Sequence, residues 1–587
     1  MIDSLNKALS AALHSLYDIQ INPDDIRLDI TRKEFEGDFT FVVFPYLRQS
    51  KKGPEHTAQE LGEAVVSAVE QLEKYNVVKG FLNLSFKSSV WVDWLTSANI
   101  TSIRTAHGSP RKIMVEYSSP NTNKPLHLGH VRNNVLGFSI CQILQQYGHE
   151  VIKVNLINDR GIHICKSMLS YHLFGDGETP ESSGLKGDHF VGKYYVLFDV
   201  KNREQAAKLV EQGMDPEEAK NNTPLMEQTR EWLRKWEEQD SEIRSLWSTM
   251  NGWVYDGFHS TYDRMGVSFD KFYHESETYL LGKDLVMEGL SSGELYQKED
   301  GSVWIDLTAD GLDQKILLRS DGTSVYMTQD IGTAQLKYDD YHMDQSVYVV
   351  GNEQDYHFQV LKATLKRLGK AYADGVFHMS YGMVELPEGK LKTREGKVVD
   401  ADDLMDEMYA TAKERTNEQG KTDGMEADEL NTLYEQLGLG ALKYFLLRVD
   451  PVKRILFNPA ESIDFQGNTG TFIQYTHARC QSILRSISFD GSVTLPDHLE
   501  AEERALVAHF HQYDDKLAEA ATNFSPAVMA NYLYETAKLF NSFYNQHSIL
   551  KAESENIKQL RILLTQRTAE TLRVCGRLLG MEMPERM

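Results

Sequence analysis

The sequence predicts an α/β protein with a parallel central sheet, a small α+β module before it and a helical domain after it. Between about 110 and 400, short apolar runs alternate with stretches of helical periodicity, a pattern typical of βαβ units. From about residue 430 onward, apolar residues recur at helical spacing almost throughout. The chain of 587 residues is long enough for several domains of ordinary size.

The first 106 residues are predicted to form the α+β module. An amphipathic helix opens the chain, "FTFVVFPYL" and the alternating "GFLNLSF" read as strands, and a helical stretch near 56–74 lies between them. The opening segment lacks the basic start and continuous apolar stretch of a signal peptide. The polar run "TSIRTAHGSPRK" then predicts a linker to the central domain.

The central domain, predicted over 110–400, begins with a βαβ unit. "KIMVEY" (112–117) and "VIKVNLI" (151–157) are predicted as buried parallel strands. The intervening helix should start near Leu128, run to about Tyr147 and end at Gly148. Ligands of such units bind beyond the carboxyl ends of the strands, where "SSPNTNKPLHLGH" (118–130) falls.

Two further regions complete the predicted organisation. A polar, tryptophan-containing helical stretch suggests an insertion at about 165–265, after which apolar strand-like runs return at "SVWIDL", "KILLRS" and "QSVYVVG". Residues 401–587 are predicted to form a helical domain that connects to the central domain.

The amino-acid composition limits which kinds of protein this chain can be. With 41% hydrophobic and 25% charged residues the chain is an ordinary globular protein. Four scattered cysteines without a CxxC pair favour a reducing compartment, and no apolar run approaches a membrane span, so we expect a cytoplasmic protein. A net charge of -24 repels nucleic acid at long range, although a local basic face can still bind phosphates.

The segment "KPLHLGH" is the first candidate site. His127 and His130 lie at a predicted helix start, where free N–H groups favour phosphate, Gly129 leaves room for a base or sugar, and Lys124 adds a cation. The same pattern is compatible with histidines that only cap the helix. A zinc site is disfavoured because no third ligand is near, and GxxxxGK[ST] is absent, so this is not a P-loop.

The second candidate element is the loop "PEGKLKTREGKVVDADDL" (387–404). Taken alone, its basic residues are equally compatible with a solvated turn; they are Lys390, Lys392, Arg394 and Lys397. Together with HLGH about 260 residues earlier, the loop resembles the second signature of class I aminoacyl-tRNA synthetases. Members of that class carry HIGH-type and KMSKS-type motifs on a Rossmann-like sheet.

The resemblance is to the arginyl-tRNA synthetases, and it covers nearly the whole chain. The segments that carry it are "VEYSSPNTNKPLHLGHVRNNVLG", "SDGTSVYMTQDIG", "LKTREGKVVDADDL", "FIQYTHARCQSILR", "YLYETAKLFNSFYN" and "MPERM". One departure is Thr393, which stands where KMSKS has its second lysine. Lys124 looks like the substitute, and Lys392 or Lys397 could share that role.

The resemblance implies a two-step reaction with ATP, arginine and tRNA(Arg) as partners. The arginine carboxylate attacks the α-phosphorus, and arginine then moves to the terminal adenosine. Magnesium is expected as a phosphate counter-ion, although no motif specifies its ligands, and no residue is predicted to bind a metal. His127, Gly129, His130 and Lys124 would face ATP from one side, and the loop residues Lys390, Lys392 and Arg394 would close from the other.

Arginine recognition needs acids, because carboxylates match the planar donors of a guanidinium. By family correspondence, the side chain would meet Tyr326, Asp330 and Gln354, while Glu116 and Asn121 would receive the α-amino and carboxylate groups. Asp159, Gly161 and His163, at the end of the second strand, could line the same pocket.

Contacts to tRNA are expected at both ends of the chain. The resemblance places Phe81 and Asn83 against a base of the tRNA elbow, although a buried strand explains Phe81 equally well. The helical domain, 401–587, resembles the family's helical connection and anticodon-binding bundle. Its aromatic and basic side chains could meet bases and phosphates, or simply fill a core; they are Phe472, Tyr475, His477, Arg479 and Arg485. Further positive charge comes from Arg561, Arg567, Arg573 and Arg577.

The sequence is compatible with three alternatives. A small-molecule nucleotidylyltransferase also uses HxGH but needs neither terminal domain, and a non-catalytic paralogue should have lost the histidines or the basic loop. A class I synthetase for another amino acid is disfavoured by the acidic pocket candidates and the C-terminal segments. We expect a monomer that does not bind membranes.

Overall fold

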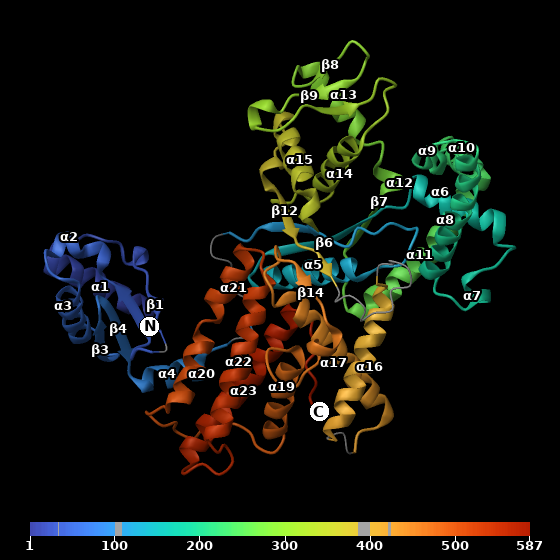
Figure 1. The fold of residues 1–587 in the computed structure, drawn as a ribbon. Coiled ribbons are helices and arrows are strands. Elements are labelled where there is room, and N and C mark those ends of the chain that lie inside the picture. The colour runs from blue at the N-terminus through green and yellow to red at the C-terminus, as the bar shows by residue number, and fades with distance from the viewer. Residues whose placement is uncertain (33, 100–101, 103–108, 386–398, 421–423) are drawn as a thin grey trace. The chain divides into compact units, whose positions relative to one another are not determined.

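The computed structural model describes residues 1–32, 34–99, 102, 109–385, 399–420 and 424–587, and Figure 1 shows the arrangement of its helices and strands. The described chain forms two compact units. One combines residues 1–101 with 479–513 and 535–571, and the other combines 102–478 with 514–534 and 572–587. Each unit therefore contains segments far apart in the sequence.

The N-terminal part of the first unit is a four-stranded antiparallel sheet with the order β1-β2-β4-β3, covered by helices. Gly62 lets a helix approach closely, since a Cβ there would lie 2.5 Å from the ring of Tyr75. The predicted helix near 56–74 ends earlier than expected, because strand β3 already begins at Leu72. The elements are α1 (Ile2–Tyr17), η1 (Pro23–Asp25), β1 (Asp29–Ile30), β2 (Phe39–Val42), η2 (Phe44–Tyr46), α2 (Leu47–Ser50), α3 (Pro54–Ala68), β3 (Leu72–Val78), β4 (Phe81–Phe86) and α4 (Ser88–Ser97).

The second unit is built on a five-stranded parallel sheet with the order β12-β11-β5-β6-β7. From β5 the chain proceeds outward through β6 and β7, and it returns on the other side through β11 and β12. Strand order therefore reverses between β5 and β11, which is the position where open α/β sheets bind ligands. The strands are β5 (Lys112–Glu116), β6 (Glu150–Ile157), β7 (Lys271–His274), β11 (Gln345–Gly351) and β12 (Val376–Tyr381).

Helix α5 (Leu128–Gln146) connects β5 to β6, which confirms the predicted βαβ unit. The helix ends at Gln146 with Tyr147 as its C-cap, and Gly148 adopts a positive φ of 101° that favours glycine. Most of its side chains are buried because it packs between the sheet and other helices. At Gly137 an added Cβ would lie 2.3 Å from the ring of Tyr117, so the helix lies directly against the end of β5.

Helices fill the chain between β6 and β7. Several of these helices have a side-chain N-cap next to them in the sequence. Asp215, Thr223 and Asp240 each accept a backbone N–H from the first turn of the helix that follows. These helices are α6 (Ile162–Phe174), α7 (Pro180–Ser183), α8 (Gly187–Glu211), α9 (Pro216–Asn221), α10 (Pro224–Glu237) and α11 (Ser241–Met265).

A smaller subdomain lies between β7 and β11. The runs "SVWIDL" and "KILLRS" form strands, but in a separate antiparallel sheet of order β10-β9-β8. Its apolar side chains share one core with α14 and α15. The elements are α12 (Glu275–Thr278), α13 (Gly282–Ser292), β8 (Tyr296–Gln297), β9 (Val303–Ile305), η3 (Thr308–Asp310), β10 (Lys315–Leu318), α14 (Tyr326–Tyr341), η4 (Asn352–Gln354), α15 (Asp355–Arg367) and η5 (Ala373–Gly375).

The remaining chain is helical, as predicted, apart from one short parallel pair, β13 (Val384–Glu385) with β14 (Ile455–Leu456). Among the described residues, no helix combines the length and apolarity needed to cross a membrane. The helices are α16 (Ala401–Gln419), α17 (Ala427–Leu447), α18 (Pro459–Ser462), α19 (Gly470–Leu484), α20 (Ala501–His511), α21 (Tyr513–Thr522), α22 (Pro526–Gln546) and α23 (Glu555–Leu578).

Candidate active site

His127 and His130 form a reciprocal cap at the start of α5. The Nδ1 atom of His127 accepts the backbone N–H of Gly129 at 3.1 Å, and Nδ1 of His130 accepts the backbone N–H of His127 at 3.2 Å. The two ring centroids lie 3.9 Å apart. Because both Nδ1 atoms accept, each neutral ring carries its proton on Nε2. The predicted capping role is therefore real, and it leaves an Nε2–H donor on each imidazole.

Without a bound ligand, both imidazoles are shifted toward the neutral form. Burial, with a smaller contribution from Lys124, lowers the pKa of His127 to about 4. Burial, together with His127 and Lys124, holds the pKa of His130 well below its ordinary value. Hydrogen-bond donation from Nε2, rather than positive charge, is thus what these rings can offer a phosphate.

The chain just after the basic loop pairs with the histidine segment. The backbone N–H of Leu128 donates to the carbonyl of Val399 at 2.9 Å, and that of Ala401 donates to Leu126 at 3.0 Å. His127 and Asp400 thereby form an antiparallel bridge. The predicted loop residues Lys390, Lys392, Arg394 and Lys397 lie outside the described residues. Two segments separated by about 270 residues nevertheless meet, and we call this pairing of 126–128 with 399–401 the seam.

Lys124 lies half-buried beside the histidines. Its ammonium lowers the pKa of both imidazoles, which places its positive charge near them. Among the described residues, no carboxylate lies within ion-pair distance of its Nζ atom. Its charge is thus available for an anionic ligand.

An open cleft of about 1000 Å³ lies beyond the carboxyl end of β6. Predicted residues that line it are Asn121, Gly161, His163, Tyr326 and Asp330. Charged and polar side chains join them from the neighbouring elements, namely Asn158, Arg160, Glu237, Glu275, Lys283, Arg319, Thr323, Ser324, Gln329 and Thr333. The cleft therefore combines acidic and hydrogen-bonding groups from both sides of the sheet edge.

Tyr326 and Asp330 lie one turn apart at the start of α14, so they share a face as predicted. Tyr326 is 77% exposed. One oxygen of Asp330 pairs with Nε2 of His357 at 2.6 Å. Asp330 therefore lines the cleft with its carboxylate already oriented by a partner.

Glu275 was not predicted. It follows β7 directly, lines the cleft and is half-buried. Burial raises its pKa to about 7, and the charges of Asp159 and Asp330 act in the same direction against Arg160. An acid next to the carboxyl end of a parallel strand, in "YHESE", is the signal that could have identified it.

Two predicted arginine-binding residues do not line this cleft. Glu116 is buried at the end of β5 and forms an ion pair with Lys337, whose ammonium lies 5.0 Å from the ring centre of Tyr348. Gln354 is exposed in η4. The charge of Glu116 is thus already balanced within the protein.

Asp159 was expected as a possible lining residue, and this is wrong. It is 1% exposed, and its carboxylate accepts the backbone N–H and hydroxyl of Ser276, both at 2.8 Å, and the hydroxyl of Tyr255 at 2.9 Å. Burial raises its pKa, but these bonds and His274 outweigh that and hold the pKa below its usual value. Asp159 therefore joins the chain after β6 to the chain after β7, next to residues that line the cleft.

The N-terminal tRNA candidates differ in accessibility. Phe81 is 37% exposed and meets the exposed Phe44 edge-to-face at 5.5 Å between ring centres. Asn83 is buried and accepts the hydroxyl of Thr40 at 2.6 Å. Phe81 has a free surface for a base, whereas the side chain of Asn83 is held inside the sheet.

In the helical domain, some of the side chains predicted to contact tRNA are partly exposed and others are buried. Tyr475 is half-buried near Phe465, and the guanidinium of Arg479 lies 4.9 Å from the ring centre of Tyr544. His477 is fully buried, with its Nδ1 3.0 Å from the carbonyl oxygen of Pro584, so stacking on a base is wrong for it.

Arg561 is also committed to the interior of its unit. It is 3% exposed and pairs with Glu503 at 2.8 Å, so it does not add to the surface charge as expected.

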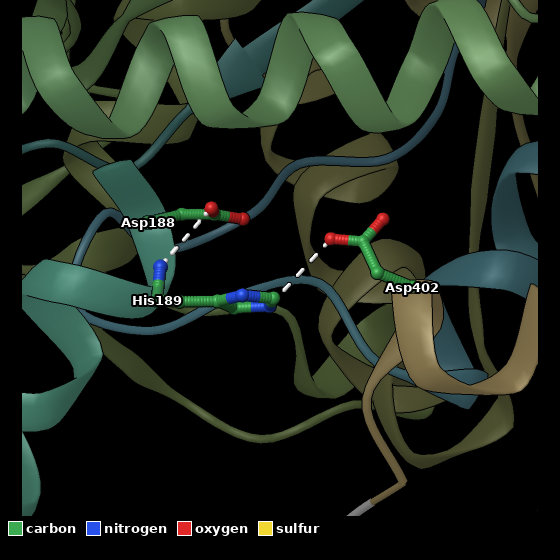
Figure 2. A group of neighbouring side chains, drawn as sticks. All are labelled: Asp188, His189 and Asp402. Carbon is green, nitrogen blue, oxygen red and sulfur yellow. Dashed lines mark hydrogen bonds and ion pairs between the residues drawn. The ribbon is translucent and has the colours of Figure 1, made fainter. Parts of the chain in front are cut away.

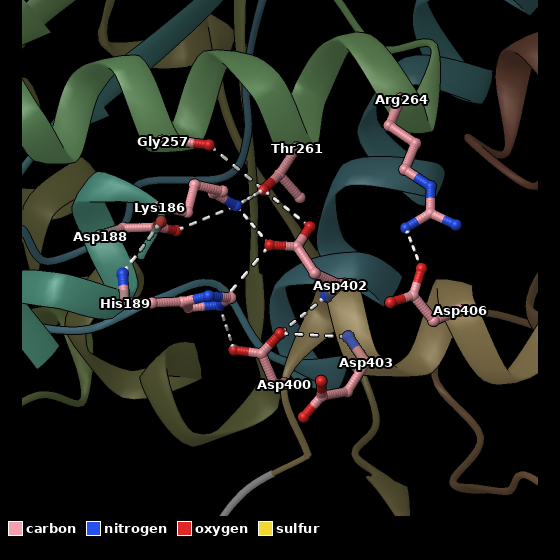
Figure 3. A network of polar contacts seen from close by, with 10 residues as sticks. All are labelled: Lys186, Asp188, His189, Gly257, Thr261, Arg264, Asp400, Asp402, Asp403 and Asp406. Carbon is pink, nitrogen blue, oxygen red and sulfur yellow. Dashed lines mark hydrogen bonds and ion pairs between the residues drawn. The ribbon is translucent and has the colours of Figure 1, made fainter. Parts of the chain in front are cut away.

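The one described group with metal-ligand spacing is Asp188, His189 and Asp402 (Figure 2). Lys186 fits between its carboxylates: the ammonium pairs with Asp402 and lies 3.3 Å from Asp188 (Figure 3). Because this ammonium already lies between the carboxylates and offsets part of their negative charge, the group is better explained as an ion-pair cluster than as a metal site.

Three family models match the chain. "tRNA synthetases class I (R), catalytic domain" matches residues 94–458, "DALR anticodon binding domain" matches 473–587, and "Arginyl tRNA synthetase N terminal domain" matches 3–86. Together they account for most of the sequence.

Curated relatives are similar along the full length. An arginine–tRNA ligase of Bacteroides fragilis strain YCH46 is 53% identical over 593 residues, covering 100% of this chain and 99% of its own. One from Parabacteroides distasonis is 52% identical with 99% and 98% covered, and one from Porphyromonas gingivalis strain W83 is 51% identical with both chains fully covered.

Solved structures support the fold. The Thermus thermophilus arginyl-tRNA synthetase superposes with a TM-score of 0.80 at 24% identity, covering 100% of this chain and 99% of its own. The Plasmodium falciparum enzyme gives 0.76 at 19% identity, covering 99% and 98%. By the matching models and the full-length relatives, the chain belongs to the arginyl-tRNA synthetases of class I, and its activity is the ligation of arginine to tRNA.

Proposed function

We propose that the chain activates arginine at the seam and the adjoining cleft, and then transfers it to tRNA(Arg). A carboxylate oxygen of arginine attacks the α-phosphorus of ATP, the bond to the β-phosphate breaks, and pyrophosphate leaves with the bonding electrons. A ribose hydroxyl of the terminal adenosine then attacks the arginyl carbonyl carbon, releasing AMP and the hydroxyl proton. The observation that carries this proposal is the backbone pairing of 126–128 with 399–401.

Catalysis in the first step comes from alignment and from stabilised charge, with no protein nucleophile. His127 and His130 donate from Nε2 to phosphate oxygens, since each Nδ1 is occupied by a backbone N–H. Lys124 supplies the fixed cation near them. Lys390, Lys392 and Arg394 act on the phosphates from the other side, and Lys124, Lys392 or Lys397 replaces the missing signature lysine.

Arginine is selected by carboxylates in the cleft. Asp330 and Glu275 both line it and both can accept from the planar guanidinium. Tyr326 covers the same side chain from the start of α14, and Asn121 binds the α-carboxylate or α-amino group. Glu116 and Gln354 lie outside this lining, so their contribution requires a rearrangement around the Lys337 pair or the start of α15.

The proposed reaction also suggests roles for magnesium and for the three regions of the chain. Magnesium enters with ATP as the counter-ion of its phosphates, and no residue of the chain is assigned to it. Residues 1–106 bind the tRNA elbow through Phe81, residues 110–400 hold ATP and arginine, and residues 401–587 bind the anticodon with Tyr475 and Arg479. The enzyme acts as a monomer in the cytoplasm, where its ATP and tRNA are found.

The test is pyrophosphate exchange into ATP with each of twenty amino acids, with and without tRNA. We expect exchange with arginine, and stronger exchange when tRNA is present. Exchange supported by another amino acid, and not by arginine, would contradict the assignment of the cleft.

A further inference from the structure

Helix α8 contacts the histidine segment at a point close to the proposed nucleotide site. Its Gly192 faces Pro125: a Cβ at Gly192 would lie 2.9 Å from Cδ of Pro125 and 3.6 Å from Cα of Lys124. The helix therefore packs directly on the two residues that precede Leu126 and His127.

One turn earlier, the same helix contacts the other segment of the seam, at the start of α16. Nε2 of His189 lies 3.0 Å from Oδ2 of Asp400 and 3.5 Å from Oδ2 of Asp402 (Figure 3). Positions 189 and 192 are one helical turn apart and lie on one face. A single face of α8 thus touches both segments, 124–125 through Gly192 and 400–402 through His189.

Asp400 links this contact to the backbone of the seam. Its Oδ1 accepts the backbone N–H groups of Asp402 at 2.8 Å and Asp403 at 3.3 Å, which caps α16, while its Oδ2 meets His189. Its own backbone is bridged to His127. Moving the Asp400 side chain would therefore displace both the start of α16 and the backbone segment that is bridged to His127.

A second ion pair fixes the same region. Lys186 pairs with Asp402 and lies 3.3 Å from the fully buried Asp188. Thr261 of α11 donates to Oδ1 of Asp402 at 3.1 Å and accepts from Lys186. The charges around His189 are thus Asp400, Asp402 and Asp403 from the start of α16, and Lys186 and Asp188 from the start of α8.

We propose that His189 is a positioning residue for arginine activation, holding Asp400 so that the seam keeps His127 and His130 aligned with ATP. This proposal rests on the proposed function. His189 acts through Asp400 and does not itself touch the substrate.

The charge of His189 strengthens this contact. The bond to Asp400 raises the pKa of His189 against the opposing effect of burial, while His189 helps to hold the pKa of Asp400 below its usual value. A raised histidine pKa means that the contribution of the pair is present at lower pH and is lost as pH rises through that pKa. The pair should therefore weaken on the alkaline side.

The experiment compares His189→Ala, His189→Gln and a control, His259→Ala, in arginine-dependent pyrophosphate exchange with tRNA across pH. Gln places an amide donor near the position of Nε2 but carries no charge. His259 is an exposed histidine of α11 that meets the ring of Phe272 edge-to-face. The ATP KM, kcat and the melting temperature of each chain are measured.

We expect His189→Ala to lower kcat/KM for ATP by about ten- to a hundredfold, as for a misplaced catalytic group. His189→Gln should recover most of this loss and lack the alkaline decline of the wild type, and His259→Ala should match the wild type. A purely structural role would lower the melting temperature but leave kcat/KM and the pH profile of folded His189→Gln unchanged.

Either wild-type kcat/KM in His189→Ala or a wild-type pH profile in His189→Gln would overturn the proposal. If His189→Ala does not fold, the pH profile of His189→Gln decides. Absence of arginine-dependent exchange in the wild-type chain would instead refute the proposed function itself, so the two failures are distinguishable.

Discussion

The two imidazoles at the start of α5 cap the helix through Nδ1, which leaves the Nε2–H of each neutral ring as a possible donor. Sequence alone predicts a helix start and a phosphate role for His127 and His130, but it leaves capping and binding as alternatives. The structure shows that a backbone N–H occupies each Nδ1, so that one ring can serve both purposes. Tautomer and charge follow from these contacts, which no residue pattern contains.

Glu275 shows what local patterns miss. Its importance comes from lying in one cleft with Asp330, which is 55 residues further along the chain and on another element. The sequence also does not predict the pairing of Glu116 with Lys337, which are 221 residues apart. For that reason Glu116 was predicted to be available to bind arginine. The sequence predicted that carboxylates bind the arginine side chain. The fold decides which carboxylates are free to do so.

At the residue scale, we predict that arginine binding depends on the ionisation of Glu275. In the free cleft its pKa is about 7, and a bound guanidinium favours the carboxylate. The KM for arginine should therefore rise as pH falls through that value, by roughly tenfold per pH unit well below it. Steady-state exchange at pH 5.5 to 8.5 measures this.

Glu275→Gln is the matched variant for that prediction. It should raise the KM for arginine by about ten- to a hundredfold at pH 8, as expected for a lost charged hydrogen bond, and remove the acidic limb of the profile. A pH-independent KM in the wild type would argue against Glu275 as an arginine ligand.

Helices and strands near the site were the most predictable elements. Short apolar runs bounded by turn residues predicted β5 and β6, and the helical periodicity from Leu128 to Tyr147 predicted α5. The runs "SVWIDL" and "KILLRS" were recognisable as strands, but their separate antiparallel sheet was not, because pairing partners are chosen by tertiary packing.

At the element scale, we predict that α5 tolerates no added methyl group where it meets β5. Gly137→Ala would place Cβ 2.3 Å from the ring of Tyr117, which is fully buried and held by the bond from its hydroxyl to Ser268. Such overpacking should cost about 1–3 kcal/mol and lower the thermal unfolding midpoint.

Gly252→Ala is the control for that experiment. Gly252 lies inside α11 and has no atom within 4 Å of an added Cβ, so alanine should stabilise that helix by about 1 kcal/mol. Equal midpoints for both variants would show that α5 does not pack on β5 as described.

At the scale of the whole molecule, contacts between distant segments create each compact unit. In the first unit, Arg504 binds the buried carboxylate of Asp38 through two nitrogens, at 2.6 and 3.0 Å. In the second, the carbonyls of Leu578 and Gly580 accept from Ser139 of α5 and Lys443 of α17. Net charge could not reveal that basic residues such as Arg504 and Arg561 balance acids inside a unit.

The proposed activation of arginine requires a neutral imidazole pair, set by the seam, that donates to ATP. The most direct measurement is arginine-dependent pyrophosphate exchange with tRNA by His130→Asn, whose side-chain oxygen can keep the cap on His127 while the Nε2 donor is lost. We predict a loss of about 10²–10³ in kcat/KM for ATP with an unchanged melting temperature. Exchange at the wild-type rate by this folded variant would contradict the account.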